Sequence, residues 1–345
     1  MSHLAFDGKR LEAEILAAPG SLPDPVFTTD SGALYHGDNL PIMLGLQRSG
    51  VRAKLIYADP PFATGREFAT DCGRLAYGDR LMGDEFLAWL HARLVVMREL
   101  LDDDGSIYLH LDQKQVFEAK VLMDEVFGKA RFRNFITRQK CSVKHTARTR
   151  LGNVSDHIVF YSKTANFIWN RPLDPHHGNQ IEKNYPYVEG TRRYATAPLH
   201  APGVRNGETG RRWRGMSPPD GKHWQVAPER LDELDAAGEI HWSPSGNPRK
   251  KVWWTPDKTI PKQDIWLGYR DARNQNAGAT GYPTEKNLAM LKTIVAASSN
   301  PGDLVLDPFC GSGAMPLAAQ ELGRRWLGID LGDEAVRTTR GRFQC

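Results

Sequence analysis

Apolar residues along the first half of the chain occur in two kinds of pattern. Short continuous apolar runs bounded by Gly, Pro or Asp predict buried strands, whereas apolar residues at i, i+3 and i+4 predict amphipathic helices. Alternation of the two favours a parallel sheet covered by helices. The predicted elements are strands at 33–36, 54–58, 106–109 and 156–161 and helices near 86–101 and 116–126.

The middle of the chain has a different character. From about residue 169 to residue 266 the periodicity disappears, and this stretch holds seven of the nine tryptophans together with many Pro, Gly and Arg residues. Because it contains no low-complexity repeat, we expect an irregular folded lobe and not a linker. Regular order then returns with a helix near 288–294, a strand at 303–307, a helix near 318–322 and a strand at 325–330. These changes divide the chain into three predicted regions: a regular part at 30–165, the irregular lobe at 166–275 and a second regular part at 276–345.

The last regular unit carries the first candidate site. Its strand ends in Asp307-Pro308-Phe309-Cys310-Gly311-Ser312-Gly313, and the following strand ends in Asp330. Glycines at a strand-to-helix turn let the backbone approach a ligand closely, and an acid after the next strand can accept hydrogen bonds from ribose hydroxyls. The third glycine of a dinucleotide site is absent, so the pattern predicts a nucleoside cofactor without a pyrophosphate.

The second candidate site is Asp59-Pro60-Pro61-Phe62, directly after the strand at 54–58. As bare residues this is an ordinary turn sequence. At the end of a buried strand, however, consecutive prolines stiffen the backbone and fix the direction of the Asp59 carboxylate and the Pro60 carbonyl. Two adjacent acceptors are suited to an amino group, and Phe62 offers a flat face on which a base can stack.

Composition narrows the class of protein. The chain has 345 residues, 40% of them hydrophobic, and a formal net charge of only +4, so any binding to phosphates depends on local basic clusters. Its four cysteines form no C-x-x-C pair, and no metal site is expected. Without a signal-like N-terminus or a long apolar run, we expect a soluble cytoplasmic protein with no membrane segment.

Together the two motifs resemble the DNA amino-methyltransferases of restriction–modification and solitary methylation systems. The catalytic tetrapeptide comes first, a recognition lobe next and the cofactor motif last, which is the permuted order of the β class. The resemblance covers about residues 34–336 and includes Gly37-Asp38 and the segment Gly281-Tyr282-Pro283-Thr284-Glu285-Lys286. In that segment the family has His and Gln where this chain has Tyr282 and Glu285, so only Thr284 and Lys286 are carried over.

The resemblance implies an α/β methyltransferase fold: a Rossmann-like, mixed and mostly parallel sheet, circularly permuted, with an inserted target-recognition lobe. It implies transfer of a methyl group from S-adenosylmethionine directly to the N6 of a flipped adenine in double-stranded DNA. The implied catalytic residues are Asp59, Pro60, Pro61 and Phe62. The implied cofactor-binding residues are Asp38, Thr284, Lys286, Asp307, Phe309, Gly311, Ser312, Gly313 and Asp330.

Basic clusters in and before the lobe favour contact with DNA phosphates, although any single tryptophan there is more readily explained by burial. The expected DNA-binding residues are Lys144, Arg148, Arg211, Arg212, Arg214, Lys250 and Lys251. A homodimer and a cognate restriction endonuclease are open as partners.

Other functions compete with this interpretation. Cytosine N4 methylation has the same mechanism, but Asp59 at the first motif position favours adenine. Cytosine C5 methylation requires a nucleophilic cysteine, typically after proline, and the chain has no Pro-Cys pair. Protein and RNA methyltransferases place the cofactor motif first, and a catalytically inactive DNA-binding homologue would not need both motifs intact.

Overall fold

The computed structural model describes residues 3–62, 66–70, 73–79, 81–142, 148–176, 178–271 and 280–344. These residues form two compact units. Unit 1 comprises Met1–Pro172 and Gln263–Cys345, and unit 2 comprises Leu173–Lys262. Unit 2 therefore interrupts unit 1 in the sequence, within the stretch where the apolar periodicity disappears.

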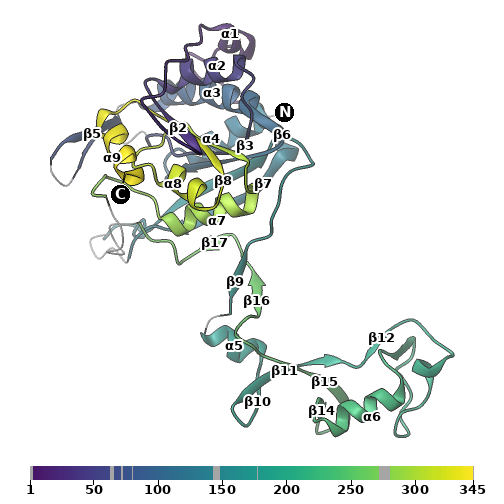
Figure 1. Cartoon of the computed structure of the whole chain (residues 1–345). Coiled ribbons are helices and arrows are strands. Elements are labelled where there is room, and N and C mark those ends of the chain that lie inside the picture. Colours follow the sequence, from purple (N-terminus) through teal and green to yellow (C-terminus); the bar gives the residue numbers. More distant parts are fainter. Residues whose placement is uncertain are drawn as a thin grey trace. The chain divides into compact units, whose positions relative to one another are not determined.

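Unit 1 is built on a nine-stranded sheet with the order β1-β2-β19-β18-β3-β6-β8-β7-β17 (Figure 1). The five central strands from β2 to β6 run parallel, whereas β1, at one edge, is antiparallel to β2. Strand β8 is antiparallel to both β6 and β7, and β17 is parallel to β7. The strands are β1 (Phe27–Thr29), β2 (Gly32–His36), β3 (Ala53–Ala58), β6 (Leu101–Leu111), β7 (Phe132–Gln139), β8 (Ser155–Ser162), β17 (Ile265–Trp266), β18 (Leu304–Asp307) and β19 (Arg325–Asp330).

Helices of unit 1 cover both faces of this sheet, and a small hairpin stands apart from it. The hairpin consists of β4 (Arg66–Ala69) and β5 (Leu75–Asp79), which pair antiparallel. The helices are α1 (Glu12–Ala17), α2 (Asn39–Arg48), α3 (Gly83–Leu100), α4 (Val116–Met123), α7 (Leu288–Ser298), α8 (Ala314–Glu321) and α9 (Asp333–Phe343), with the π-helical turn Asp124–Gly128 and the 3₁₀ turn Lys129–Arg131 after α4.

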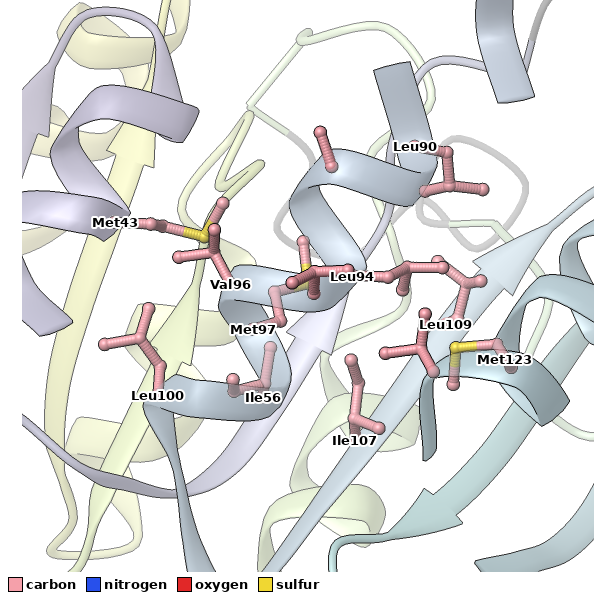
Figure 2. Close-up of a cluster of buried hydrophobic side chains, with 14 of the residues drawn as sticks. Met43, Ile56, Leu90, Leu94, Val96, Met97, Leu100, Ile107, Leu109 and Met123 are labelled. Atoms are coloured by element: carbon pink, nitrogen blue, oxygen red, sulfur yellow. The ribbon is translucent and has the colours of Figure 1, made fainter. Parts of the chain in front are cut away.

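Two apolar cores lie against the sheet. Figure 2 shows part of the first, in which Leu94 and Met97 of α3 lie with Ile56 of β3 and Ile107 of β6. The second core contains side chains of α7 and α8 together with the alternate residues of the strands, such as Leu55 and Val305. Because successive strand residues point to opposite faces, a continuously apolar strand such as β3 supplies both cores.

Unit 2 is made of short strands around a small aromatic core. Its buried residues Leu199, Trp213, Trp224, Leu231 and Ile240 form one cluster. The strands β10, β11, β15 and β14 pair in that order, and β12–β13 and β9–β16 form separate antiparallel pairs. The elements are β9 (Leu173–Pro175), α5 (Gly178–Asn184), β10 (Tyr187–Glu189), β11 (Arg192–Pro198), β12 (His200–Pro202), the 3₁₀ turn Glu208–Gly210, β13 (Lys222–Trp224), α6 (Pro228–Ala236), β14 (Ile240–Trp242), β15 (Pro248–Trp253) and β16 (Thr259–Pro261).

Candidate active site

The carboxyl ends of four neighbouring strands of unit 1 carry the acidic residues singled out in the sequence. Asp38 follows β2, Asp59 follows β3, Asp307 ends β18 and Asp330 ends β19. These strands are parallel, so their ends meet at one edge of the sheet, which is where open α/β sheets bind ligands. The structure therefore gathers residues from both halves of the sequence at one place.

A cavity of about 340 Å³ opens at this edge. The tetrapeptide, the glycine turn, the segment 282–286 and the β4–β5 hairpin all contribute to its wall. Of the residues expected to be catalytic or to bind cofactor, those lining the cavity are Asp38, Asp59, Pro60, Pro61, Phe62, Thr284, Lys286, Asp307, Phe309, Gly311, Ser312 and Asp330. Gly313 is not among the lining residues; it lies within the glycine turn, directly before α8.

The glycine turn requires both of its glycines, for different reasons. Gly311 has φ +50° and Gly313 has φ +75°, a region that residues with a Cβ rarely adopt. A Cβ on Gly313 would also lie 2.7 Å from the Thr339 hydroxyl of α9, whereas a Cβ on Gly311 would meet Tyr282 at an ordinary 3.4 Å. The turn is thus fixed by backbone conformation at Gly311 and additionally by close packing at Gly313.

Asp330 is held by the backbone of the same turn. Its Oδ2 accepts a hydrogen bond from the Gly311 N–H at 2.8 Å, and its Oδ1 accepts one from the Gly332 N–H at 2.9 Å. Burial raises the pKa of Asp330, while these backbone hydrogen bonds oppose the rise. Asp330 is therefore a fixed acceptor beside the turn, where a ribose hydroxyl could donate to it.

Asp307 is more deeply buried than Asp330. Its Oδ1 accepts from the Phe309 N–H at 3.0 Å, and burial raises its pKa well above the ordinary aspartate value. Because this hydrogen bond bridges the two ends of the Asp307-Pro308-Phe309 segment, the carboxyl group shapes the start of the turn.

The Asp59 carboxylate has two unlike oxygens. Its Oδ2 forms an ion pair with the ammonium of Lys286, which arrives from the segment before α7. Its Oδ1 is buried and has no hydrogen-bond partner among the described residues. The same ammonium lies 5.2 Å from the centre of the Phe62 ring. Lys286 thus fixes Asp59 and Phe62 together and leaves one carboxylate oxygen unsatisfied.

The departures from the family motif at 281–286 have structural partners. Glu285 is buried and forms an ion pair with Arg342 of α9, and the Arg342 guanidinium also donates to the Ser312 carbonyl. Tyr282 is buried in a small cluster with Ala76 and Ala335. Both residues therefore support the glycine turn and, like Thr284 with its φ of +58°, they line the cavity.

A buried polar chain beneath the tetrapeptide was not predicted. The Tyr57 hydroxyl and His110 Nδ1 are 2.6 Å apart, and His110 Nε2 lies 3.1 Å from the Asp156 carboxylate. Arg138 lies on the other side of Asp156 and forms an ion pair with Asp271. Burial alone would raise the pKa of Asp156, but His110 and Arg138 lower it far below the ordinary value.

This series of buried polar side chains supports the tetrapeptide, because Tyr57 is two residues before Asp59 and the His110 ring lies 6.2 Å from the Phe62 ring. The apolar pattern hides such residues, since Tyr57 and His110 lie in the buried, mainly apolar parts of β3 and β6.

A second unpredicted cluster surrounds Arg93 of α3, which is 5% exposed and lines the cavity. The guanidinium donates to Asp38 Oδ1 and to Asn39 Oδ1, each at 2.7 Å, and lies 3.9 Å above the Trp89 ring. Asn39 in turn donates to the Pro308 carbonyl at 2.7 Å. Asp38, which also caps α2 through the Leu40 N–H, is thereby connected to the turn that contains the cofactor motif.

The expected DNA-binding residues lie in varied surroundings. Lys144 is outside the described residues, and Arg148 is exposed in unit 1. In unit 2, Arg212 and Lys250 are exposed, whereas Arg211 and Arg214 form ion pairs with acidic residues of α6. Lys251 is only 8% exposed, is ion-paired to Glu189 and lies over the rings of Tyr194 and Trp253, so its position indicates packing and not phosphate contact.

The part of the chain that the structure describes has neither a metal-binding cluster nor a membrane-spanning helix. No group of three or more His, Cys, Asp or Glu side chains there is arranged to hold a metal ion. Likewise, no described helix is both long and apolar enough to cross a membrane.

Comparison with known proteins gives the class of this chain. A family model described as DNA methylase, of the N6/N4 methyltransferases, matches residues 53–340. The chain therefore belongs to the DNA methylase family. This membership confirms the expected class of enzyme and its methyl donor, S-adenosylmethionine.

Individual relatives agree with that assignment. The type II methyltransferase M.EcaI of Enterobacter cloacae is 50% identical over 306 residues, which are 89% of this chain and 68% of that protein. The DNA adenine methyltransferase YhdJ of Escherichia coli is 48% identical over 56 residues, 16% of this chain and 19% of that protein. The crystal structure of M1.HpyAVI is 15% identical with a TM-score of 0.50, covering 91% of this chain and 99% of that one, which confirms the fold.

Proposed function

We propose that this DNA methylase transfers the methyl group of S-adenosylmethionine to the N6 of adenine in double-stranded DNA. The observation that carries the proposal is the Asp59 carboxylate at the cavity wall: Lys286 holds its Oδ2, and its buried Oδ1 has no partner among the described residues. A buried acceptor without a donor is costly unless a ligand supplies one. An exocyclic amino group is such a donor.

The chemical difficulty of the reaction is that the lone pair of an exocyclic amine is delocalised into the ring. A hydrogen bond from the amine to Asp59 Oδ1 pulls the nitrogen toward tetrahedral geometry and localises its lone pair. The ion pair with Lys286 prevents the carboxylate from turning away, so the acceptor is oriented before the substrate arrives. Such preorganised groups stabilise the charge that develops on the nitrogen, and no covalent intermediate with the protein is required.

A base can reach this carboxylate only after leaving the double helix. Unstacking costs about a few kcal/mol, and a flat apolar side chain in the pocket offsets part of that cost. Phe62 lines the cavity three residues after Asp59, and its ring centre lies 5.2 Å from the Lys286 ammonium and 6.2 Å from the His110 ring. We assign Phe62 to stacking with the flipped base.

The cofactor would occupy the neighbouring part of the cavity. S-adenosylmethionine supplies an electrophilic methyl group on a sulfonium. Asp330 is suited to accept from the ribose hydroxyls, and the Gly311–Gly313 turn allows close approach of the backbone. Donors and acceptors for a nucleoside and for an amino acid are thus both present among the lining residues.

Two observations support adenine over cytosine. The first residue of the tetrapeptide is Asp59, whereas the cytosine N4 enzymes that this sequence resembles usually have Ser there. The Escherichia coli relative that shares 48% identity over its matched segment is named as a DNA adenine methyltransferase.

Recognition of the DNA sequence is assigned to unit 2, which separates the two motifs in the chain and carries exposed Arg212 and Lys250. We further propose that the enzyme belongs to a restriction–modification system, because a relative from Salmonella typhimurium, 25% identical over 348 residues, is named as the Mod subunit of a type III restriction-modification enzyme.

Nucleoside mass analysis tests the proposal directly. Duplex DNA of varied sequence is incubated with the protein and S-adenosylmethionine carrying an isotope-labelled methyl group, then digested to nucleosides. Label in N6-methyl-2′-deoxyadenosine supports the proposal. Label in N4-methyl-2′-deoxycytidine would retain the mechanism but contradict the choice of base, and an absence of label from all DNA would contradict the proposed reaction.

A further inference from the structure

Arg93 is a buried cation whose presence in the cavity the family motifs do not explain. Its side chain is 6% exposed, and it extends from α3, away from both the tetrapeptide and the glycine turn in sequence. Burial lowers its pKa to about 10, against the opposing effect of Asp38, so the guanidinium remains charged at neutral pH. A charged group at this depth requires compensating partners.

The guanidinium is only partly satisfied by the protein. Nε donates to Asn39 Oδ1, one Nη donates to the Trp89 carbonyl, and the other Nη donates to Asp38 Oδ1. Arginine has five N–H groups, so two of them have no partner among the described residues. The side chain is held rigidly by these bonds and by its stacking on Trp89, and it still has donors to offer.

The surroundings of Arg93 show which part of a ligand it would meet. Asn39 connects it to the Pro308 carbonyl, and the Trp89 ring lies 5.5 Å from the Phe309 ring, so Arg93 lies beside the start of the cofactor motif. Lys286 is also a basic residue among those that line the cavity, but its ammonium group is paired with Asp59. The Asp38 side chain, in contrast, is 52% exposed although it accepts from Arg93. Opposite charges are therefore presented side by side.

We propose that Arg93 binds the α-carboxylate of S-adenosylmethionine, with Asp38 beside it accepting from the α-ammonium group. This inference rests on the proposed function and adds a residue that fixes the amino-acid end of the cofactor. A guanidinium recognises a carboxylate through paired N–H donors, which a lysine cannot reproduce. Because the amino-acid end is anchored, the sulfonium is held at a defined distance from the turn.

Binding measurements with two ligands test this inference without any methyl transfer. Isothermal titration calorimetry compares S-adenosylmethionine with decarboxylated S-adenosylmethionine, which lacks only the α-carboxylate, on the unaltered protein and on Arg93→Gln. We expect the substitution to weaken binding of S-adenosylmethionine about 10- to 100-fold, as for the loss of hydrogen bonds between charged groups. Binding of the decarboxylated ligand should change less than about threefold, since the lost partner is absent from it.

Asp330→Ala is the matched control, because it should weaken both ligands equally through the ribose that they share. If Arg93→Gln also weakens both equally, Arg93 only packs α3 against α2 and the inference is overturned. Should Arg93→Gln fail to fold, Arg93→Lys decides by the same comparison: loss confined to S-adenosylmethionine supports the inference, and an equal loss overturns it. Failure of the unaltered, folded protein to bind S-adenosylmethionine would overturn the proposed function as well.

Discussion

Two of the carboxylates that line the cavity, those of Asp330 and Asp59, are held by different kinds of partner. Asp330 follows β19, and both of its oxygens accept backbone N–H groups, from Gly311 and Gly332. Asp59 follows β3, and its one partner among the described residues is the side chain of Lys286, which pairs with a single oxygen. Asp330 is thus positioned by the local course of the chain, and Asp59 by a residue more than two hundred positions later.

These two modes of support suit two different ligand groups. Backbone donors cannot rotate away, so the Asp330 end is suited to a ligand bound in one pose in every cycle. A carboxylate oxygen left without a donor is suited to a group that arrives only during catalysis, such as the amine of a flipped base. Substitutions can break this contrast at either end.

The largest effect is expected for Asp59→Ala. Removal of the acceptor should lower the rate of methyl transfer about 10²- to 10³-fold, by analogy with the loss of one preorganised catalytic donor. The affinity for S-adenosylmethionine should stay within about threefold, because Asp330 and Arg93, which we propose to hold the ribose and the carboxylate, lie on β19 and α3.

Single-turnover methylation and calorimetry measure the two quantities. Asp103→Ala is a suitable control, since its side chain is 87% exposed and distant in the fold from the strand ends. A comparable loss of cofactor binding and rate in Asp59→Ala would contradict separate roles for the two carboxylates.

Next in size is Asp156→Asn, beneath the Asp59 end. Breaking one partner of a buried charged group costs about 3 kcal/mol in the free energy of unfolding. The folded-state pKa of Asp156 lies below the unfolded value, so its contribution is present above pH ~3.9 and is lost as the pH falls further. Urea unfolding between pH 7 and pH 3 should therefore show the largest gap between the two proteins at neutral pH.

Asp104→Asn serves as the control for that series, because this half-exposed partner of Lys54 should contribute less than about 1 kcal/mol. An unchanged free energy of unfolding in Asp156→Asn would show that His110 and Arg138 do not depend on its charge.

Asp330→Ala should weaken S-adenosylmethionine binding about 10- to 100-fold through lost hydrogen bonds to the ribose. Burial raises the pKa of Asp330, so in the unaltered protein it gains a proton, and loses acceptor capacity, at a higher pH than an exposed aspartate. Affinity measured by calorimetry should fall as the pH drops through that raised pKa. Asp330→Ala should show a flatter profile, and an identical profile would exclude this carboxylate as the titrating group.

The smallest effect expected is the difference between two glycine substitutions. Gly311→Ala introduces strain from φ alone, and Gly313→Ala adds a clash with Thr339. Thermal unfolding should place Gly313→Ala lower in stability by about 1 kcal/mol, beyond the ~1–3 kcal/mol that each loses through strain. Equal melting temperatures would mean that α9 moves freely away from the turn.

Much of unit 1 could be predicted from the sequence because its elements bury continuous apolar faces. The strands at 54–58, 303–307 and 325–330 and the helix near 86–101 all correspond to observed elements, β3, β18, β19 and α3. The two motifs can be recognised in the sequence because a glycine turn and a proline pair are local features. The family resemblance implies that Lys286 binds cofactor, but the sequence does not predict its ion pair with Asp59.

Other features depend on tertiary neighbours and could not be predicted. In the sequence, residues 102–104 are typical of a solvated helix end. In the structure α3 ends at Leu100, β6 begins at Leu101, and Lys54 pairs with Asp102 and Asp104 in the first part of this strand. Arg93 falls on the buried side of an amphipathic helix, where only the fold reveals that it faces a cavity. In unit 2, short strands around an aromatic core leave no periodic signal.

The contact between α9 and the glycine turn has a consequence for how occupancy of the cavity would be detected. Thr339 donates to the Gly311 carbonyl and packs against Gly313, and Arg342 donates to the Ser312 carbonyl. None of the described residues of α9 lines the cavity itself. A ligand that immobilises the turn should therefore slow amide hydrogen exchange in this outer helix, which would report binding without touching the ligand.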